Sequence, residues 1–352
     1  MLLSVQDLSV RFQTEDGTVH AVNGVSFDLE ASETLGIVGE SGCGKSATSL
    51  AITRLLPHTQ ATIAGGRILF RDVDLLGMPA RAMRKLRGRD IAIVFQDPMT
   101  SLNPVLSIGR QLTEALRAHE SLPRTDAEAR AIELLQTVGI PAPAATLQRH
   151  PHQLSGGMRQ RVMIAMALAL APRLLIADEP TTALDVTIQA QVLELIRELT
   201  RQRGTAVILI THDLGIVAQM TQRVAVMYAG FIVETALTPD LFAAPRHPYT
   251  IGLLHSLPRL DKERGGELIS IEGSPPDQLT PPAGCPFAPR CAWRLPVCST
   301  ANPSLTTASG SGDATDARAK HRVACHNPAT AEEASAGQPL RPGTAAGLEA
   351  VP

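Results

Sequence analysis

The sequence predicts an α/β fold with a largely parallel sheet, and three observations support this prediction. Short apolar segments with the composition of buried strands alternate with helical segments. One of these strands leads directly into a glycine-rich loop and a helix. Two others end in acidic or histidine side chains, at the edge of a parallel sheet where ligands collect. The expected strands are Thr34–Val38, Ile91–Phe95, Arg173–Glu179 and Val207–Ile210.

Composition limits the classes of function. The 352 residues suffice for one large domain and a smaller appendage, and 44% hydrophobic with 19% charged residues suits a globular chain. A net charge of −2 gives no basic footprint, so we expect no nucleic-acid partner. Residues Met1–Asp7 resemble neither a signal peptide nor a transit peptide. Because the longest apolar run, Val162–Ala171, is too short to cross a bilayer, any membrane role is expected to depend on partner proteins.

The first 29 residues predict an antiparallel hairpin. Apolar and polar side chains alternate from Leu3 to Leu29, with a turn at Asp16-Gly17. An adenine base needs a flat side chain on which to stack. The candidates in this region are Phe12 first, and then Phe27 and His20. The alternative is that Phe12 packs beneath the hairpin as an ordinary core residue.

The stretch Gly39–Ser46 fits the phosphate-loop pattern G-x-x-x-x-G-K-[ST] at every fixed position. Its context also fits, since a strand precedes the loop and helical composition follows as far as Pro57. In this arrangement backbone N–H groups point at a phosphate, Lys45 reaches the β- and γ-phosphates, and the Ser46 hydroxyl binds Mg²⁺. We therefore expect the chain to bind a nucleoside triphosphate with Mg²⁺. The expected contacts are Gly39, Ser41, Gly42, Cys43, Gly44, Lys45 and Ser46.

Cys43 stands inside this loop, close to a helix N-terminus and two residues before Lys45. Both features lower the pKa of a thiol and raise its reactivity. We therefore expect alkylation of Cys43 to block nucleotide entry and bound ATP to protect it. The alternative is that Cys43 only fills a variable position of the motif.

A helical stretch separates two strand-rich halves of the chain. Gln96 follows the strand Ile91–Phe95, and the pattern is helical from Ser107 to Gly139. We interpret residues 97–165, approximately, as an inserted helical subdomain. Near its end, the tetrapeptide Leu-Ser-Gly-Gly precedes an apolar helix. Its residues Ser155, Gly156 and Gly157 are expected to form an anion site at the helix start, a specific signal only because a phosphate loop is also present.

Two carboxylates, Asp178 and Glu179, follow an apolar strand. Asp178 suits a Mg²⁺ ligand, and Glu179 suits a general base for an attacking water. Burial of the strand up to Asp178 argues against an ordinary surface position. Asp185 lies in the following loop, and His212 ends the strand Val207–Ile210 at the same sheet edge, although a single histidine is usually structural.

Beyond Glu234 the composition changes, and we expect a boundary near Thr235. Residues 1–235 then form the main domain, residues 236–326 a small Cys-rich appendage, and residues 327–352 a disordered tail.

The appendage contains four cysteines in the pattern C-x5-C-x6-C-x26-C. A loop-rich region with few large apolar residues needs a covalent or metal staple. Because disulfides are disfavoured in a chain without a secretion signal, a metal remains, and four thiolates suit either Zn²⁺ or an iron–sulfur cluster. The wide spacing favours the cluster slightly, and free thiols are the alternative. The four residues are Cys285, Cys291, Cys298 and Cys325.

The ordered set of motifs resembles the ATPase domain of ABC transporters over residues 1 to about 235. Further stretches resemble one subgroup, the oligopeptide/dipeptide importer ATPases with their nickel-importing relatives, and within it the D-type dipeptide-importer subunits. These stretches are Phe95–Pro104, His247–Thr250 and Cys285–Cys291. Met158 departs from the Gln of the wider family's signature, but it is familiar in the D-type subunits.

The resemblance implies a RecA-like core with an antiparallel β subdomain and an inserted helical subdomain. Two such domains face each other head to tail, so that the Leu-Ser-Gly-Gly helix start contacts ATP held by the partner chain. Gln96 would touch Mg²⁺ or the attacking water, His212 would hold the γ-phosphate, and Asp185 would help to join the two faces. The resemblance also favours a structural 4Fe–4S cluster on the four cysteines.

The partners implied by the resemblance are a second, related ATPase subunit, two permeases and, indirectly, an external substrate-binding protein. The chain would lie at the cytoplasmic face of the membrane, with the loop Asp97–Pro104 docking on a permease unless it is a plain proline-rich turn. Peptides lead as cargo, while nickel or another small solute stays open. Weaker alternatives are a non-transport ATPase of the same superfamily, a small-molecule P-loop kinase and a binding module without catalysis.

Overall fold

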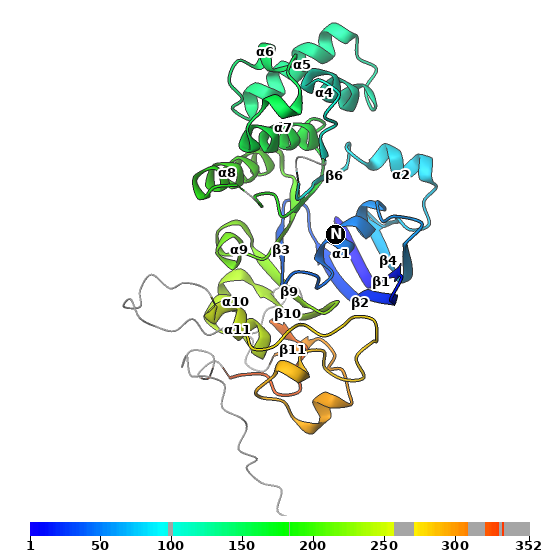
Figure 1. Ribbon diagram of the computed structural model, residues 1–352, viewed down its shortest axis with the longest axis vertical. Helices are drawn as coiled ribbons and strands as arrows, with labels where there is room; N and C mark the ends of the chain where they lie inside the picture. The colour runs from blue at the N-terminus through cyan, green and yellow to red at the C-terminus, as the bar shows by residue number, and fades with distance from the viewer. Residues whose placement is uncertain (98–100, 183, 257–270, 309–320, 331–332, 334–352) are drawn as a thin grey trace, which may run out of the picture.

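An eight-stranded sheet forms the centre of the computed structural model, which describes residues 1–97, 101–182, 184–256, 271–308, 321–330 and 333 (Figure 1). Its strand order is β11-β12-β10-β9-β3-β8-β7-β6. The five strands from β9 to β6 are parallel, which confirms the predicted sheet, whereas β10 and β12 join it antiparallel. The bounds are β3 Thr34–Val38, β6 Ile91–Val94, β7 Leu174–Asp178, β8 Ala206–Thr211, β9 Arg223–Tyr228, β10 Phe231–Leu237, β11 Thr306–Thr307 and β12 Arg322–Val323.

The parallel strands are continuous apolar runs because both faces of the sheet are covered. Every residue of β7, β8 and β9 is buried. Helix α1 packs on one face, where Ile52 joins a core with Ile37 and Ile208. On the other face α9 contributes Val217 to a core that also contains Val38. Because β3, β8 and β7 are parallel neighbours, their carboxyl ends meet at one edge of the sheet.

A second, antiparallel sheet lies beside α1 and has the order β2-β1-β4-β5. Thr14 pairs with Gly17 across a tight turn, which confirms the predicted hairpin. Apolar side chains such as Leu3, Leu8 and Ile68 are fully buried beneath the sheet, in the core that α1 shares. The strands are β1 Leu3–Thr14, β2 Gly17–Leu29, β4 Ala61–Phe70 and β5 Val73–Asp74.

Helices α4 to α7 form one end of the molecule, at the top of Figure 1. They share a core in which Leu112, Leu116 and Leu135 are fully buried. None of the helices within the described ranges has the length and apolar character of a membrane span. The helices are α1 Lys45–Thr53, α2 Ala80–Leu86, α4 Ile108–Arg117, α5 Arg124–Thr137, α6 Pro143–Thr146, α7 Gly156–Leu168, α8 Val186–Arg203, α9 Leu214–Met220, α10 Thr238–Ala243 and α11 Pro248–His255.

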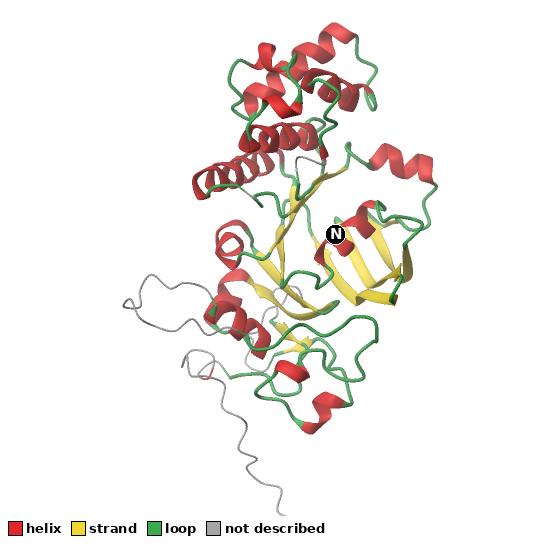
Figure 2. Cartoon of the chain, in the orientation of Figure 1, coloured by secondary structure: helices red, strands yellow, loops and turns green. Residues whose placement is uncertain are grey.

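The C-terminal segment, meaning residues 271–308, 321–330 and 333, is mostly loop (Figure 2). Its strands β11 and β12 nevertheless extend the main sheet, since Arg322 of β12 pairs with Thr235 of β10. The prediction of a separate Cys-rich appendage is therefore not supported. Most of the predicted tail, residues 334–352, lies outside the described residues, as do residues 98–100 of the predicted docking loop.

Candidate functional site

The phosphate loop joins β3 to α1 and lies tightly against neighbouring backbone. Gly39 and Gly44 have φ angles of 156° and 102°. A Cβ atom at Gly39 would lie 2.1 Å from the Met227 carbonyl oxygen, and one at Gly44 would lie 2.2 Å from that of Ala21. Both the backbone angles and the lack of space therefore require glycine at these two positions.

Lys45, the first residue of α1, is only 5% exposed. Its Nζ donates hydrogen bonds to the carbonyl oxygens of Gly39 (2.8 Å) and Glu40 (2.9 Å), which holds the ammonium group within the loop. A buried cation next to the N-terminus of a helix favours an anionic ligand. An incoming phosphate would replace the two carbonyl acceptors with a stronger, charged one.

Asp178, at the end of β7, lies next to the start of α1. Its two carboxylate oxygens accept hydrogen bonds from Ser46 and Ser49, each at 3.1 Å. Burial raises the pKa of Asp178, and the two hydroxyl donors partly offset this effect. A hydroxyl and a buried carboxylate at this distance form the oxygen donor set that Mg²⁺ prefers.

Glu179 brings three other polar side chains together. One carboxylate oxygen accepts from Gln96 Nε2 and from the Thr182 hydroxyl, both at 2.9 Å, and the other lies 3.4 Å from His212 Nδ1. The Glu179 side chain is 15% exposed, so it is held in place but open to a small molecule. Its backbone has a φ of 45°, a left-handed conformation that is strained for a residue with a Cβ. Strain of this kind is common at functional sites.

Two helix starts lie away from the phosphate loop. Ser155 caps α7 by accepting from Met158 N (3.3 Å), and Asp185 caps α8 by accepting from Ile188 N (2.9 Å). A Cβ at Gly157 would lie 2.7 Å from the Ile188 side chain, so the two helix starts pack together. Both Ser155 and Asp185 are exposed. In Figure 1, α7 and α8 stand well apart from α1, the helix that Lys45 begins.

The adenine-stacking residue stays a prediction. Phe12 is half-buried on β1 and packs against the main core, as Phe27 does on β2. His20 is also half-buried, and its backbone N–H donates to the carbonyl of Gln278.

The prediction of a lowered pKa at Cys43 is wrong. The residue is 4% exposed, and burial raises the pKa of its thiol. The nearby Lys45 ammonium acts in the opposite direction but does not overcome burial. A protonated, enclosed thiol is a poor nucleophile.

The structure does not support the predicted iron–sulfur cluster. In the part of the chain that it describes, no three His, Cys, Asp or Glu side chains are arranged to hold a metal ion. The four cysteines are free thiols of one region, and the backbone N–H of Cys285 donates to the Cys298 carbonyl. Mainly through burial, the pKa of Cys291 is raised to about 11 and that of Cys325 to about 12.

Several residues of the site were not singled out from the sequence. Ser49 lies one helical turn after Ser46, so the helical period could have identified it. Thr182 lies three residues after Glu179, in the loop that follows β7. Arg290 forms an ion pair with Glu40 of the phosphate loop. It belongs to the stretch Cys285–Cys291 that carries the resemblance, but nothing in that stretch indicates a contact with the loop.

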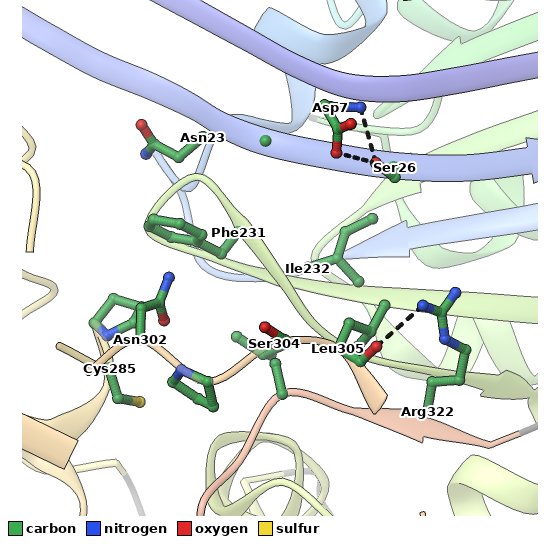
Figure 3. Close-up of a pocket in the computed structure, with 15 residues that line it drawn as sticks. Asp7, Asn23, Ser26, Phe231, Ile232, Cys285, Asn302, Ser304, Leu305 and Arg322 are labelled. Carbon is green, nitrogen blue, oxygen red and sulfur yellow. Dashed lines mark hydrogen bonds between the residues drawn. The ribbon is translucent and has the colours of Figure 1, made fainter. Parts of the chain in front are cut away.

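A pocket of about 370 Å³ lies away from the phosphate loop, between β2, β10 and the C-terminal segment (Figure 3). Asp7 and Ser26 line one wall, where the Ser26 hydroxyl donates to the Asp7 carboxylate. Arg322 lines the other, and it already donates to the carbonyl of Leu305. Because neither Lys45 nor Asp178 lines it, we do not assign the phosphates to this pocket.

Comparison with known families gives two matches. A family described as "ABC transporter" matches residues 22–182, which include the phosphate loop, Gln96 and Asp178-Glu179. A second, "Oligopeptide/dipeptide transporter, C-terminal region", matches residues 233–298.

Curated relatives match nearly end to end. The chain is 55% identical to a dipeptide transport ATP-binding protein (DppD) of Bacillus subtilis, over 92% of this chain and 97% of that protein. It is 51% identical to an oligopeptide transport ATP-binding protein (OppD) of Salmonella typhimurium, over 86% and 90% of the two chains.

Solved structures agree with the fold. A dimeric ATP-binding cassette with bound ADP and phosphate matches with a TM-score of 0.60 and 24% identity, over 67% of this chain and 99% of that one. The cbiO1 protein of Clostridium perfringens, part of an ABC transporter complex, matches with a TM-score of 0.58 and 30% identity, over 69% and 90%.

Proposed function

The chain belongs to the ATP-binding subunits of the oligopeptide/dipeptide ABC transporter family, and from this premise we propose that it hydrolyses ATP to drive the import of peptides. The observation that carries the proposal is the meeting of the phosphate loop, Asp178 and Glu179 at one edge of the parallel sheet. A P-loop kinase or a binding module would not need Glu179 held beside Gln96 and His212.

The phosphate loop and Asp178 would hold Mg-ATP. Backbone N–H groups of the loop and the Lys45 ammonium would bind the β- and γ-phosphates. The Ser46 hydroxyl and the Asp178 carboxylate, with Gln96, would bind Mg²⁺, which neutralises phosphate charge when bound. Burial raises the pKa of Asp178. A bound Mg²⁺ would act in the opposite direction and favour the ionised carboxylate.

Glu179 would act as the general base for the attacking water. The amide of Gln96 and the hydroxyl of Thr182 orient the Glu179 carboxylate by donating to one of its oxygens. His212 lies next to the other oxygen. From there we propose that His212 contacts the γ-phosphate. Since Gln96 precedes the predicted docking loop, a permease that moves this loop would also move a partner of the base. This gives a direct path from the permease to hydrolysis.

The Leu-Ser-Gly-Gly helix start would complete the site of a second ATPase subunit. Ser155, Gly156 and Gly157 are exposed or half-buried at the N-terminus of α7. We propose that they bind the ATP of a related subunit in a head-to-tail heterodimer, with Asp185 at the joint. ATP would then favour the closed pair, and hydrolysis would release it.

Two permeases at the cytoplasmic face of the membrane, supplied by an external substrate-binding protein, would complete the transporter. The cargo is tested by deleting the gene and measuring uptake of labelled dipeptides, longer peptides and nickel. We expect peptide uptake to be lost, and to be restored by the wild-type chain but not by Lys45→Ala. Unchanged peptide uptake with lost nickel uptake would contradict the peptide proposal in favour of the metal.

We propose that the four cysteines bind a structural 4Fe–4S cluster, although no side chains among the described residues are already arranged to hold a metal. The donor set has the right chemistry, since four thiolates are its usual ligands, and backbone N–H groups donate to the sulfurs of Cys298 (3.3 Å) and Cys325 (3.4 Å). With raised pKa values, these thiols would release protons on binding. Protein purified without oxygen should be brown and contain iron and acid-labile sulfide. Stoichiometric zinc, or four titratable thiols, would contradict the cluster.

A further inference from the structure

The turn Cys285–Cys291 in the C-terminal segment contacts the phosphate loop from a distance of 250 residues in the sequence. Arg290 pairs with the Glu40 carboxylate through two parallel hydrogen bonds, Nη1 to Oε2 at 2.7 Å and Nη2 to Oε1 at 3.1 Å. The Arg290 side chain is 6% exposed and that of Glu40 is 26% exposed. A bidentate ion pair of this kind fixes the orientation of the carboxylate as well as its distance from the guanidinium group. Because the pair is partly shielded from water, salt screens its attraction less.

The guanidinium group of Arg290 is itself held by the C-terminal segment. Its Nε donates to the carbonyl of Glu272 (2.9 Å), and Nη2 donates to that of Ile271 (3.2 Å). The group also lies over the ring of Tyr228, 5.8 Å from the ring centre. Glu40 is therefore bonded to a rigid arginine whose position depends on the segment around it.

Two further hydrogen bonds join later parts of the chain to the same loop. The backbone N–H of Glu40 donates to the Tyr249 hydroxyl (2.9 Å), and Gln278 Nε2 donates to the Gly42 carbonyl (3.1 Å). Tyr249 is fully buried on α11. Neither these bonds nor the Arg290 pair involves the Lys45 ammonium group, which among the described residues bonds only within the loop.

Packing links these contacts to the turn itself. Phe287, at its middle, is 2% exposed and lies against Tyr228, Tyr249 and His247, with ring centres 5.3, 5.5 and 5.8 Å apart. A shift of the turn would therefore move both Arg290 and Tyr249. On the side facing β2, by contrast, the segment borders the open pocket of Figure 3, in which Cys285 forms part of the wall.

We propose that Arg290 is a positioning residue for the phosphate loop and that, through Glu40, it couples the conformation of the Cys285–Cys291 turn to nucleotide affinity. The inference rests on the proposed function in one respect, namely that the loop binds Mg-ATP. Because such coupling is reciprocal, nucleotide binding also stabilises the turn. The C-terminal segment thus acts on the ATP site without contacting ATP.

The first test measures the Kd of the full-length chain for Mg-ATP. Arg290→Met, which keeps the length and stacking of the side chain, and Glu40→Gln should each weaken binding by about tenfold. The double variant should bind no worse than the weaker single one, because both changes break the same pair. Arg290→Lys should be intermediate, since it keeps the charge but loses the fork. Arg294→Met, at an exposed arginine of the same segment, serves as the matched control and should bind normally.

Hydrogen exchange of residues 285–291 provides the second test. Mg-ATP should slow their amide exchange in the wild-type chain but not in Arg290→Met, although exchange in the phosphate loop should still slow at saturating nucleotide. If Arg290→Met does not fold, both the Kd for Mg-ATP and the hydrogen exchange are measured on Glu40→Gln alone. Normal affinity in Glu40→Gln, or additive losses in the double variant, would overturn the inference. Failure of the wild-type chain to bind Mg-ATP would instead overturn the proposed function.

Discussion

The ATP site and the C-terminal segment are held in place in different ways. In the proposed ATP site, Asp178 ends a fully buried strand and Lys45 begins a helix, so regular hydrogen bonding fixes their backbone positions. Glu179 directly follows the strand, and its N–H donates to the Ile210 carbonyl of the neighbouring β8. The C-terminal segment has only short 3₁₀ helices and two-residue strands among its described residues (Figure 2). A few buried side chains, chiefly Phe287 and Arg290, attach it to the rest of the chain.

The two regions should therefore respond differently to substitution. A change at the end of a strand of the sheet alters the reacting groups and leaves their scaffold intact, so turnover should fall while stability is kept. A change at an anchor of the C-terminal segment alters the scaffold, so affinity or stability should change while the reacting groups remain.

Glu179→Gln should lower ATP turnover by about a hundredfold or more and leave ATP binding intact. The amide keeps the shape of the side chain and its contact with Thr182, but it is no base. The ATPase rate of the assembled transporter and the Kd for Mg-ATP are the measurements. Glu194→Gln, on the exposed face of α8, is the matched control and should turn over normally. Near-normal hydrolysis by Glu179→Gln would remove the general base from this position.

Ser155→Arg should impair the ATP site of the partner subunit and leave this chain's own ATP site intact. Ser155 is the exposed cap of α7, which stands well apart from α1, so the isolated chain should bind Mg-ATP as before. The assembled ATPase should slow by about tenfold or more, because the bulky cation occupies the place of a phosphate donor in the partner's site. The isolated chain should also be a poor ATPase. Efficient hydrolysis by a strict monomer, independent of concentration, would contradict the shared site.

The chain should become less stable in acid because of His247, which caps α11 and packs against Phe287 of the C-terminal segment. Burial lowers the pKa of this histidine to about 4, partly opposed by Glu234, which in turn contacts His321. The unfolded chain binds a proton below about pH 6.5 that the folded chain does not, so stability should be complete above that pH and fall as the pH drops toward 4.

Thermal unfolding between pH 7.5 and 4.5 measures this effect. His247→Asn keeps an acceptor for the Tyr249 N–H and should flatten the pH dependence. His58→Asn, at an exposed histidine, should leave it unchanged. Equal pH dependence in wild type and His247→Asn would place the acid-sensitive group elsewhere.

The smallest effect is expected at Cys43. Its buried thiol, with a raised pKa, should react with iodoacetamide much more slowly at pH 7.5 than the same residue in the unfolded chain. Mg-ATP should add little protection, because the folded loop already encloses the sulfur. Labelling of the Cys43 peptide, followed by mass spectrometry, gives both rates. Rapid labelling that Mg-ATP abolishes would show that the loop opens far more than its geometry suggests.

Sequence reasoning succeeded where function and local structure coincide. The phosphate loop, the strand that ends at Asp178 and the helix start at Ser155 each combine a short motif with a predicted element, and each lies where the pattern placed it. It failed at Cys43, since the pKa argument from Lys45 and the helix start took no account of burial by distant residues. Whether four cysteines share a metal could not be decided from their spacing either.

The parallel α/β fold, the phosphate loop and the acidic pair Asp178 and Glu179 could be predicted from the sequence alone. Apolar runs, glycine-rich loops and carboxylates at strand ends are short local patterns that can be recognised without knowing the tertiary structure. Only the tertiary structure decided which side chains meet Glu179, that β12 extends the main sheet beside β10, and that Arg290 reaches Glu40. The physical reason is that these contacts join distant parts of the chain, such as Glu179 with His212, 33 positions away, and Glu40 with Arg290, 250 positions away. They depend on how the elements pack. No periodicity along the chain reports such packing.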